Sequence, residues 1–211
     1  ELGYWQVQVR SVRIGNTVLE DCADGGCRAI LDTGTSLLGV PRQAARTMHK
    51  MLARHVPDQD KYTDVAQIDC RRVPGHRLEF ELMGGMVVSL GAEDYSRPTP
   101  FNMTLPNSKE SKLFCRSLLL PVDMAAPLGP KVFIWGEPVL RRYYTVYDLA
   151  EKQIGFTEAR QPDDSSSPAG LPAVGAPPPG SLVSGAPLPP MHSSPAPRNE
   201  QPGGEGLTAV V

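Results

Sequence analysis

The stretch that decides the fold reads Arg28-Ala29-Ile30-Leu31-Asp32-Thr33-Gly34-Thr35-Ser36-Leu37-Leu38. It begins with an apolar run, Ala29 to Leu31, which predicts a buried strand. The strand delivers one carboxylate, Asp32, into a turn of small hydroxyl residues and glycine, after which Leu37 and Leu38 lead the chain back inside. This pattern predicts an acidic side chain held in a fixed position at the edge of an apolar core.

A carboxylate in such a turn can be oriented for chemistry. Gly34 has no Cβ, so backbone amides can approach Asp32, while the hydroxyls of Thr33 and Thr35 can lock the turn. A carboxylate activates water only when its proton affinity and orientation are controlled, and two carboxylates brought together can share one proton. Asp and Gly are also ordinary turn residues, so these three positions alone are equally compatible with a turn that performs no chemistry.

The flanking residues favour the chemical interpretation. The run from Ala29 to Leu38 resembles the second active-site segment of pepsin-like aspartic proteases. Other landmarks of that family follow in the same order: an opening Tyr-Trp-Gln strand at residues 4–14, an apolar strand ending at Gly136, and an Arg-Tyr-Tyr strand followed by an Ile-Gly-Phe hairpin at residues 142–156. The resemblance covers residues 3 to about 159. It implies a mainly β fold, the C-terminal lobe of a bilobal double-psi barrel-type protease, with one or two short helices.

The resemblance also implies roles for the residues of the turn. Asp32 is expected to be one half of a catalytic carboxylate pair, with Thr33 and Gly34 supporting it. Thr35 is expected to contact the backbone of a peptide substrate, and Ser36 to make an outer hydrogen bond that supports the site. The implied reaction is hydrolysis of peptide bonds by an activated water, for which no cofactor and no metal are expected.

Two apolar residues further along the chain are candidates for the substrate pocket. Leu120 and Val122 align with family positions that wall the substrate subsites, although ordinary packing in the core explains them equally well. Two other positions depart from the family pattern. Trp135 replaces a small aliphatic residue, and Glu137 replaces an aspartate. A tryptophan beside the catalytic strand could crowd the site, so these departures bear on catalytic competence.

Only one Asp-Thr-Gly or Asp-Ser-Gly sequence occurs in the 211 residues. The leading hypothesis is therefore an aspartic endopeptidase in which this chain supplies the second catalytic aspartate and needs a first, N-terminal lobe. One alternative is a non-catalytic peptide- or protein-binding module derived from a protease. The other is a homodimeric aspartic protease, which the size of the lobe and its cysteines disfavour.

The four cysteines, Cys22, Cys27, Cys70 and Cys115, allow three complete pairings. None is spaced as CxxC, so a zinc site is not expected. The resemblance implies disulfides Cys22–Cys27 and Cys70–Cys115, the alternative being four buried free thiols. Disulfides indicate an oxidising compartment, and we expect a protein of the secretory pathway, whether secreted, lysosomal or vacuolar.

The composition excludes several kinds of partner. The formal net charge is -2 and basic residues are not clustered in a run, so no nucleic-acid partner is expected. No apolar stretch approaches the roughly 20 residues that cross a bilayer, so no membrane segment is expected in this chain. The sequence opens on Glu1 rather than Met, which suggests a piece of a longer protein.

We call residues 32–37 the active turn. Outside it, periodicity predicts one helix and one hairpin. Apolar residues recur at helical spacing between Pro41 and Pro57, and His49 and His55 are expected on the solvated side of that helix. Residues 78–82 and 86–90 alternate around the turn at residues 83–85, which predicts a β-hairpin with Glu79 and Glu81 on its polar face.

The remaining segments are rich in proline and small polar residues. A surface loop is expected over residues 96–113, with Asn102 in an N-glycosylation sequon. The chain is divided into a protease-like lobe at residues 1–160 and a tail at residues 161–211. The tail holds 12 of the 22 prolines and has no aromatic residue or cysteine, which predicts a disordered tail. Binding of proline-reading modules by the tail is the alternative to a plain solvated extension.

Overall fold

The computed structural model describes residues 3–104, 110–159 and 182–184. Within these ranges the chain is mainly β, as the sequence predicts, with one large sheet and two small ones. The strands are β1 (Gln6–Ile14), β2 (Thr17–Val18), β3 (Cys27–Leu31), β4 (Leu38–Pro41), β5 (Arg54–His55), β6 (Leu78–Leu82), β7 (Val87–Leu90), β8 (Phe101–Thr104), β9 (Ser111–Cys115), β10 (Leu119–Val122), β11 (Val132–Trp135), β12 (Tyr143–Asp148), β13 (Gln153–Glu158) and β14 (Leu182–Ser184). The helices are α1 (Arg42–Leu52), α2 (Ala92–Tyr95) and α3 (Glu137–Arg142), with 3-10 turns η1 (Glu20–Cys22), η2 (Gln59–Lys61), η3 (Val65–Gln67) and η4 (Cys70–Arg72).

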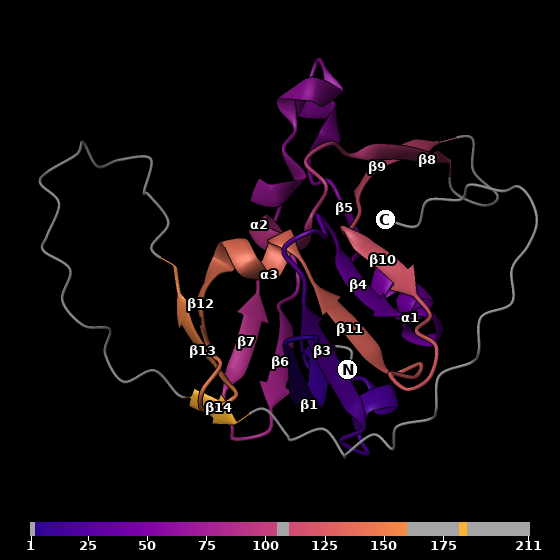
Figure 1. The fold of residues 1–211 in the computed structure, drawn as a ribbon. Coiled ribbons are helices and arrows are strands. Elements are labelled where there is room, and N and C mark those ends of the chain that lie inside the picture. Colours follow the sequence, from indigo (N-terminus) through magenta and orange to yellow (C-terminus); the bar gives the residue numbers. More distant parts are fainter. Residues whose placement is uncertain (1–2, 105–109, 160–181, 185–211) are drawn as a thin grey trace, which may run out of the picture.

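The large sheet runs in the order β10-β4-β11-β3-β1-β6-β7, with β2 paired to β1 (Figure 1). The predicted opening strand is β1, whose valines and Ile14 face the core in alternation except at a bulge between Val9 and Ser11. The predicted hairpin is β6–β7, in which Leu78 pairs with Leu90. The expectations drawn from two-residue periodicity are therefore confirmed in this half of the sheet.

The strands that carry the active turn are interleaved. β3 and β4 are consecutive in the sequence, but β11 lies between them, parallel to β3 and antiparallel to β4. Trp135, at the end of β11, pairs with Leu31 on one side and with Leu38 on the other. The loop at residues 32–37 therefore passes over the end of a strand that comes about a hundred residues later in the chain.

The core lies beneath this sheet and is centred on aromatic rings. The indole of Trp135 is fully buried, and its centroid lies 5.2 Å from that of Phe80, which in turn lies 5.3 Å from that of Phe133. Each buried side chain of this size stabilises the fold by about 2–3 kcal/mol relative to an exposed one. The interior beneath the active turn is thus densely filled.

The predicted helix forms but ends earlier than expected. Pro41 precedes the first residue of α1, as predicted, whereas the helix stops at Leu52 rather than near Pro57. Arg54 and His55 instead form β5, which pairs with β9. The prediction that His55 lies on the helix is wrong, because pairing with a distant strand overrides the local helical spacing.

The predicted surface loop is also wrong in part. Residues 101–104 and 111–115 form the hairpin β8–β9, in which Phe101 lies opposite Phe114. Asn102 is exposed on β8, and its side-chain oxygen accepts a hydrogen bond from the Ser111 hydroxyl. The cross-strand pair of phenylalanines stabilises these two strands. The sequence did not predict them because the neighbouring prolines and small polar residues are typical of a loop.

The structure forms both disulfides that the resemblance implies. Cys22–Cys27 links η1 to β3, just before the active turn, and Cys70–Cys115 links η4 to β9 across 45 residues of sequence. Arg54 reinforces the second link, because its guanidinium donates hydrogen bonds to the carbonyl oxygens of Cys70 and, at 3.0 Å, Val73. None of the helices in the described ranges is long and apolar enough to cross a bilayer.

Most of the predicted disordered tail lies outside the described residues. Three residues of it, Leu182–Ser184, form β14 and pair antiparallel with β13, with Val183 opposite Ile154. This pairing is possible because β13 offers a sheet edge, to which a short apolar segment can add. The disordered tail itself stays a prediction.

Candidate active site

Asp32 is the first residue after β3, and both its backbone and its side chain are held. Its amide donates a hydrogen bond to the carbonyl oxygen of Trp135 at 3.1 Å. One carboxylate oxygen, Oδ1, accepts the Gly34 amide at 2.9 Å, and the other, Oδ2, accepts the Thr35 hydroxyl at 2.6 Å. The half-buried carboxylate is therefore oriented by one backbone donor and one side-chain donor.

The far side of the active turn rests directly on Gly136. The Glu137 amide donates to the carbonyl oxygen of Thr35 at 2.8 Å. A Cβ added to Gly136 would lie 2.0 Å from that oxygen and 2.5 Å from the carbonyl oxygen of Leu37. Only glycine permits this approach. The sequence indicated a strand that ends at glycine, but the reason for the glycine becomes visible only in the contact between two distant segments.

The other predicted residues of the turn lie around the carboxylate. Thr33, Gly34 and Ser36 are exposed, and a Cβ on Gly34 would stand 3.3 Å from Asp32 Oδ1, a tight contact. Thr35 is half-buried, and its hydroxyl is engaged by Asp32. The predicted substrate contact of Thr35 and the outer hydrogen bond of Ser36 stay predictions.

The two pocket candidates lie on β10, which runs parallel to β4. Leu120 is opposite Gly39 and Val122 is opposite Pro41, so both flank the strand that leaves the active turn. Leu120 is 41% exposed and Val122 is half-buried. Leu120 therefore does not belong to the buried core, and the substrate-pocket role of both residues stays a prediction.

The side chains at the two departures from the family pattern, Trp135 and Glu137, have partners other than Asp32. The Trp135 indole packs against Phe80 and, at 6.0 Å between ring centroids, Phe156, so its bulk is accommodated in the core. Its contact with the active turn is made by its backbone carbonyl. Glu137 is exposed in the first turn of α3, with its carboxylate 3.9 Å from the Arg141 guanidinium.

One of the two histidines differs from the prediction of a solvated side chain. His49 is half-buried, and its Nδ1 lies 3.1 Å from the Ser117 hydroxyl. Burial lowers the pKa of His49, and the charges of Arg97 and Arg116 lower it further. The prediction was wrong because Ser117 comes from a distant segment that the helical spacing cannot reveal. His55 is exposed, as predicted, although it lies on β5.

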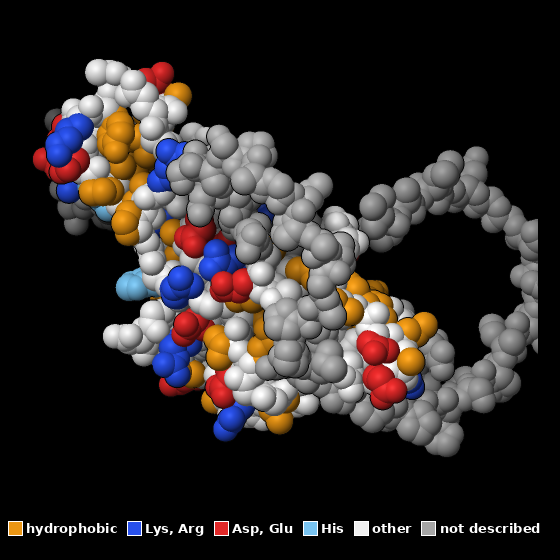
Figure 2. All heavy atoms as spheres, turned by 90° about the vertical axis from the view of Figure 1, so that its left-hand side faces the viewer, with side chains coloured by type: hydrophobic (Ala, Val, Ile, Leu, Met, Phe, Trp, Pro, Cys, Tyr) orange, Lys and Arg blue, Asp and Glu red, His pale blue; other side chains and the backbone are white. Residues whose placement is uncertain are grey.

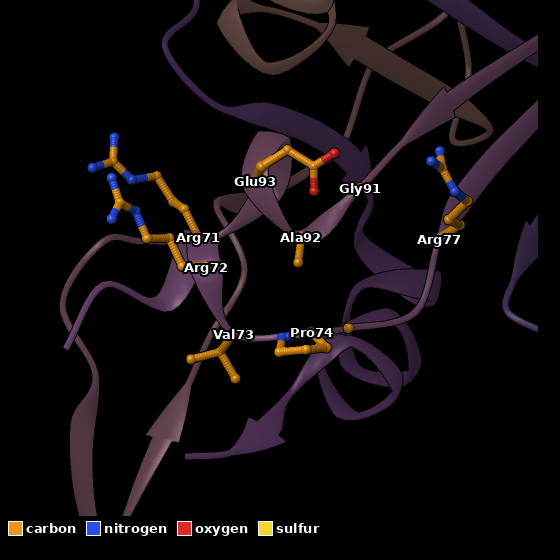
Figure 3. Close-up of a pocket in the computed structure, with 9 residues that line it drawn as sticks. Arg71, Arg72, Val73, Pro74, Arg77, Gly91, Ala92 and Glu93 are labelled. Atoms are coloured by element: carbon orange, nitrogen blue, oxygen red, sulfur yellow. The ribbon is translucent and has the colours of Figure 1, made fainter. Parts of the chain in front are cut away.

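Asp32 lines neither of two hollows in the described part of the chain. The first, about 270 Å³, has Arg71 and Arg72 on one side and Arg77 on the other, with Glu93 between them (Figure 3). The second, about 460 Å³, lies beside α1 and is lined by Arg42, Ala45, Arg46, His49, Lys50 and Pro121. The described residues contain no cluster of three or more His, Cys, Asp or Glu side chains suited to a metal ion.

Comparison with known proteins identifies relatives over the same residues. Residues 1–159 match the family described as "Eukaryotic aspartyl protease". Cathepsin D of Homo sapiens is 34% identical over 156 residues, and cathepsin D of Chionodraco hamatus is 31% identical over 157 residues. Cathepsin E of Mus musculus is 30% identical over 156 residues. Each match covers 74% of this chain and 34–36% of the relative, so the chain spans about a third of the length of these relatives.

Proposed function

Because the chain belongs to the eukaryotic aspartyl proteases, we propose that it is the second lobe of a two-lobed aspartic endopeptidase, with Asp32 as one of the two catalytic carboxylates. The observation that carries the proposal is the geometry of Asp32. Both carboxylate oxygens accept hydrogen bonds, from the Gly34 amide and the Thr35 hydroxyl, on a loop clamped over the end of β11.

The reaction requires a second carboxylate. Two facing carboxylates share one proton, a behaviour established for aspartic proteases in general. The ionised member takes a proton from a water molecule, whose oxygen attacks the carbonyl carbon of the substrate peptide bond. The protonated member donates to the carbonyl oxygen. As the tetrahedral intermediate collapses, the C–N bond breaks and a proton passes to the leaving amine. In this scheme Gly34 and Thr35 keep Asp32 directed at the water.

Exposed apolar side chains on the surface of the lobe support the proposal of a partner lobe. Side chains on and after β12 are unusually exposed for apolar residues: Tyr144 is 64% exposed, Val146 is 45% exposed and Leu149 is 78% exposed. Figure 2 views this side of the molecule and shows hydrophobic side chains reaching the surface between charged ones. Exposed apolar side chains grouped on one element are typical of a surface that another protein unit covers. We propose the N-terminal lobe of the same protease as that unit.

The two disulfides support assembly in an oxidising compartment, and we propose the secretory pathway as the location of the complete protein. Its substrates are proposed to be peptides and proteins. The main alternative is a non-catalytic binding module. One argument for it was that Trp135 could crowd the site, and the packing of Trp135 in the core weakens that argument.

The proposal is tested by peptide hydrolysis from acidic to neutral pH, comparing this chain alone with the complete two-lobed protein. Activity confined to the complete protein, and blocked by a statine-type transition-state mimic, is the expected result. Asp32→Asn is expected to reduce that activity by at least about 10²–10⁴-fold while leaving the fold intact. Activity of the isolated chain that rises with the square of its concentration would mean a homodimer. Inactivity of both preparations would favour the binding module.

A further inference from the structure

Three of the six residues that line the hollow beside α1 are basic, and their aliphatic stems contribute to a lining surface that is mostly apolar. We call it the basic hollow; it is formed by Arg42, Ala45, Arg46, His49 and Lys50 of α1 together with Pro121 of β10. Arg42, Arg46 and Lys50 follow one another at intervals of four residues, so they form a single stripe along the helix. Pro121, which is half-buried, supplies apolar surface between the cations and β10, while Ala45 forms the buried floor of the hollow.

This concentration of charge runs against both the composition of the protein and the needs of the helix. The whole chain carries a net charge of -2, whereas α1 contains no acidic residue. Like charges four residues apart destabilise a helix, as does a cation in its first turn such as Arg42, whereas Lys50 lies in the last turn, where a cation is favourable. Arg42 has a carboxylate partner, Asp123, at 3.8 Å, while Arg46 and Lys50 have no ion-pair partner among the described residues. Such a local cost indicates that the cations serve something other than the stability of the helix.

The hollow is separate from the candidate active site. Side chains alternate between the two faces of a strand, so Pro121 points to the opposite face of β10 from Leu120 and Val122. Leu120 and Val122 lie opposite Gly39 and Pro41 of β4, whereas Pro121 faces α1. A ligand in the basic hollow would therefore lie behind the strand that borders the proposed substrate cleft.

The spacing of the cations matches an extended peptide. Residues four apart on a helix are separated by about 6 Å along its axis. In an extended chain, residues two apart lie on the same side and are separated by about 6.6 Å. Acidic residues at positions i and i+2 of an extended peptide can therefore contact Arg46 and Lys50 together, with a neighbouring apolar side chain over Pro121.

We propose that the basic hollow binds an acidic peptide segment of a protein partner, outside the catalytic cleft. His49 adds a pH dependence to this binding. Its Nδ1 is engaged by Ser117, and the groups that face it from the neighbouring segments are the guanidiniums of Arg97 and Arg116, with Arg46 and Lys50 on its own helix. Because the pKa of His49 lies below its ordinary value of 6.5, its protonation adds one more positive charge to the hollow only below that pH, and binding strengthens as the pH falls through this range.

The experiment uses the complete 211-residue chain and a fluorescein-labelled probe, Gly-Leu-Glu-Ala-Glu-Leu-Gly, with its termini blocked. Fluorescence anisotropy gives the Kd at pH 7.5 and pH 5.5, both above the ordinary pKa of a glutamate, about 4.3. Arg46→Glu and Lys50→Glu are each expected to weaken binding by roughly fivefold to tenfold, the effect of reversing one surface charge. Rising salt is expected to weaken it too. Thermal melting verifies that each variant is folded.

The controls distinguish binding in the basic hollow from non-specific electrostatic attraction between the acidic probe and the protein. Arg13→Glu reverses an exposed arginine on β1, away from the hollow, and is expected to leave the Kd within about twofold after correction for net charge. Asp32→Asn is expected to have no effect. A probe with glutamine in place of both glutamates is expected to lose binding, and His49→Gln to abolish the tightening between pH 7.5 and pH 5.5.

The proposal is overturned if Arg13→Glu weakens binding as much as Lys50→Glu, or if the glutamine probe binds as well as the acidic one. It is also overturned if free glutamate competes as effectively as the peptide, since the hollow would then accept a single carboxylate. Binding of a sulfated oligosaccharide but not of the peptide would assign the hollow to a different class of partner. A pH effect that survives in His49→Gln removes His49 from the site.

Discussion

Substitution of Gly136 by alanine tests how the active turn is supported. The added Cβ would lie 2.0 Å from the Thr35 carbonyl oxygen and 2.5 Å from that of Leu37, whereas ordinary contacts begin at 3.4 Å. Both oxygens belong to backbone, so the turn itself must move by more than 1 Å. Overpacking of this kind costs about 1–3 kcal/mol, and loss of the hydrogen bond from the Glu137 amide adds about 1 kcal/mol.

The expected destabilisation is therefore about 2–4 kcal/mol, which corresponds to a fall in Tm of about 5–15 °C for a folded unit of this size. Differential scanning calorimetry of the isolated chain measures it. Gly3→Ala is the matched control, because nothing lies within 4 Å of a Cβ at that position. In the complete protease Gly136→Ala is expected to reduce kcat, since Asp32 is displaced with the turn. Equal melting temperatures for the two variants would refute the steric argument.

Further predictions concern a buried carboxylate, the disulfides and the partner surface. Burial raises the pKa of Asp94 above its ordinary value of 3.8, so this carboxyl stabilises the fold below its unfolded pKa and loses that contribution as the pH rises through the folded one. Asp94→Asn should flatten the corresponding decline in urea-unfolding free energy between pH 4 and pH 7, and an unchanged slope would contradict the assignment. Cys70→Ser should cost about 4 kcal/mol in chemical unfolding and Cys22→Ser about 2 kcal/mol, because the Cys70 disulfide closes the longer loop; the reverse order would count against loop entropy. Leu149→Asp should leave the Tm of the isolated lobe unchanged yet weaken its association with the N-terminal lobe in a pull-down, and undiminished association would exclude this surface.

The elements that could be predicted from the sequence are those whose signals are local. Alternation at residues 78–90 specified the β6–β7 hairpin, and the apolar run before Asp32 specified β3. The position of the carboxylate followed directly, since a strand end and a Gly-containing turn fix it. The family resemblance supplied the disulfide pairing, which spacing alone left open among three possibilities.

The features that escaped prediction depend on contacts between distant segments. The end of α1 at Leu52 is set by the pairing of β5 with β9, and the environment of His49 is set by Ser117. The role of Gly136 is likewise a property of two backbones that approach each other, not of either sequence. Short-range periodicity carries no information about such contacts. The contacts that hold the active turn in place could therefore be predicted less well than the carboxylate of Asp32.

The interleaving of β3, β11 and β4 also has a consequence for the ribosome-bound chain. The amide of Asp32 and the carbonyl of Thr35 are both held by the β11–α3 junction, at Trp135 and Glu137. During synthesis the nascent polypeptide therefore carries Asp32 through about a hundred further residues before the groups that orient its carboxylate emerge. Non-local pairing of this kind forms late and as a unit. The nascent lobe is thus expected to remain chemically silent until its synthesis is nearly complete, which separates the making of a protease from the onset of its activity.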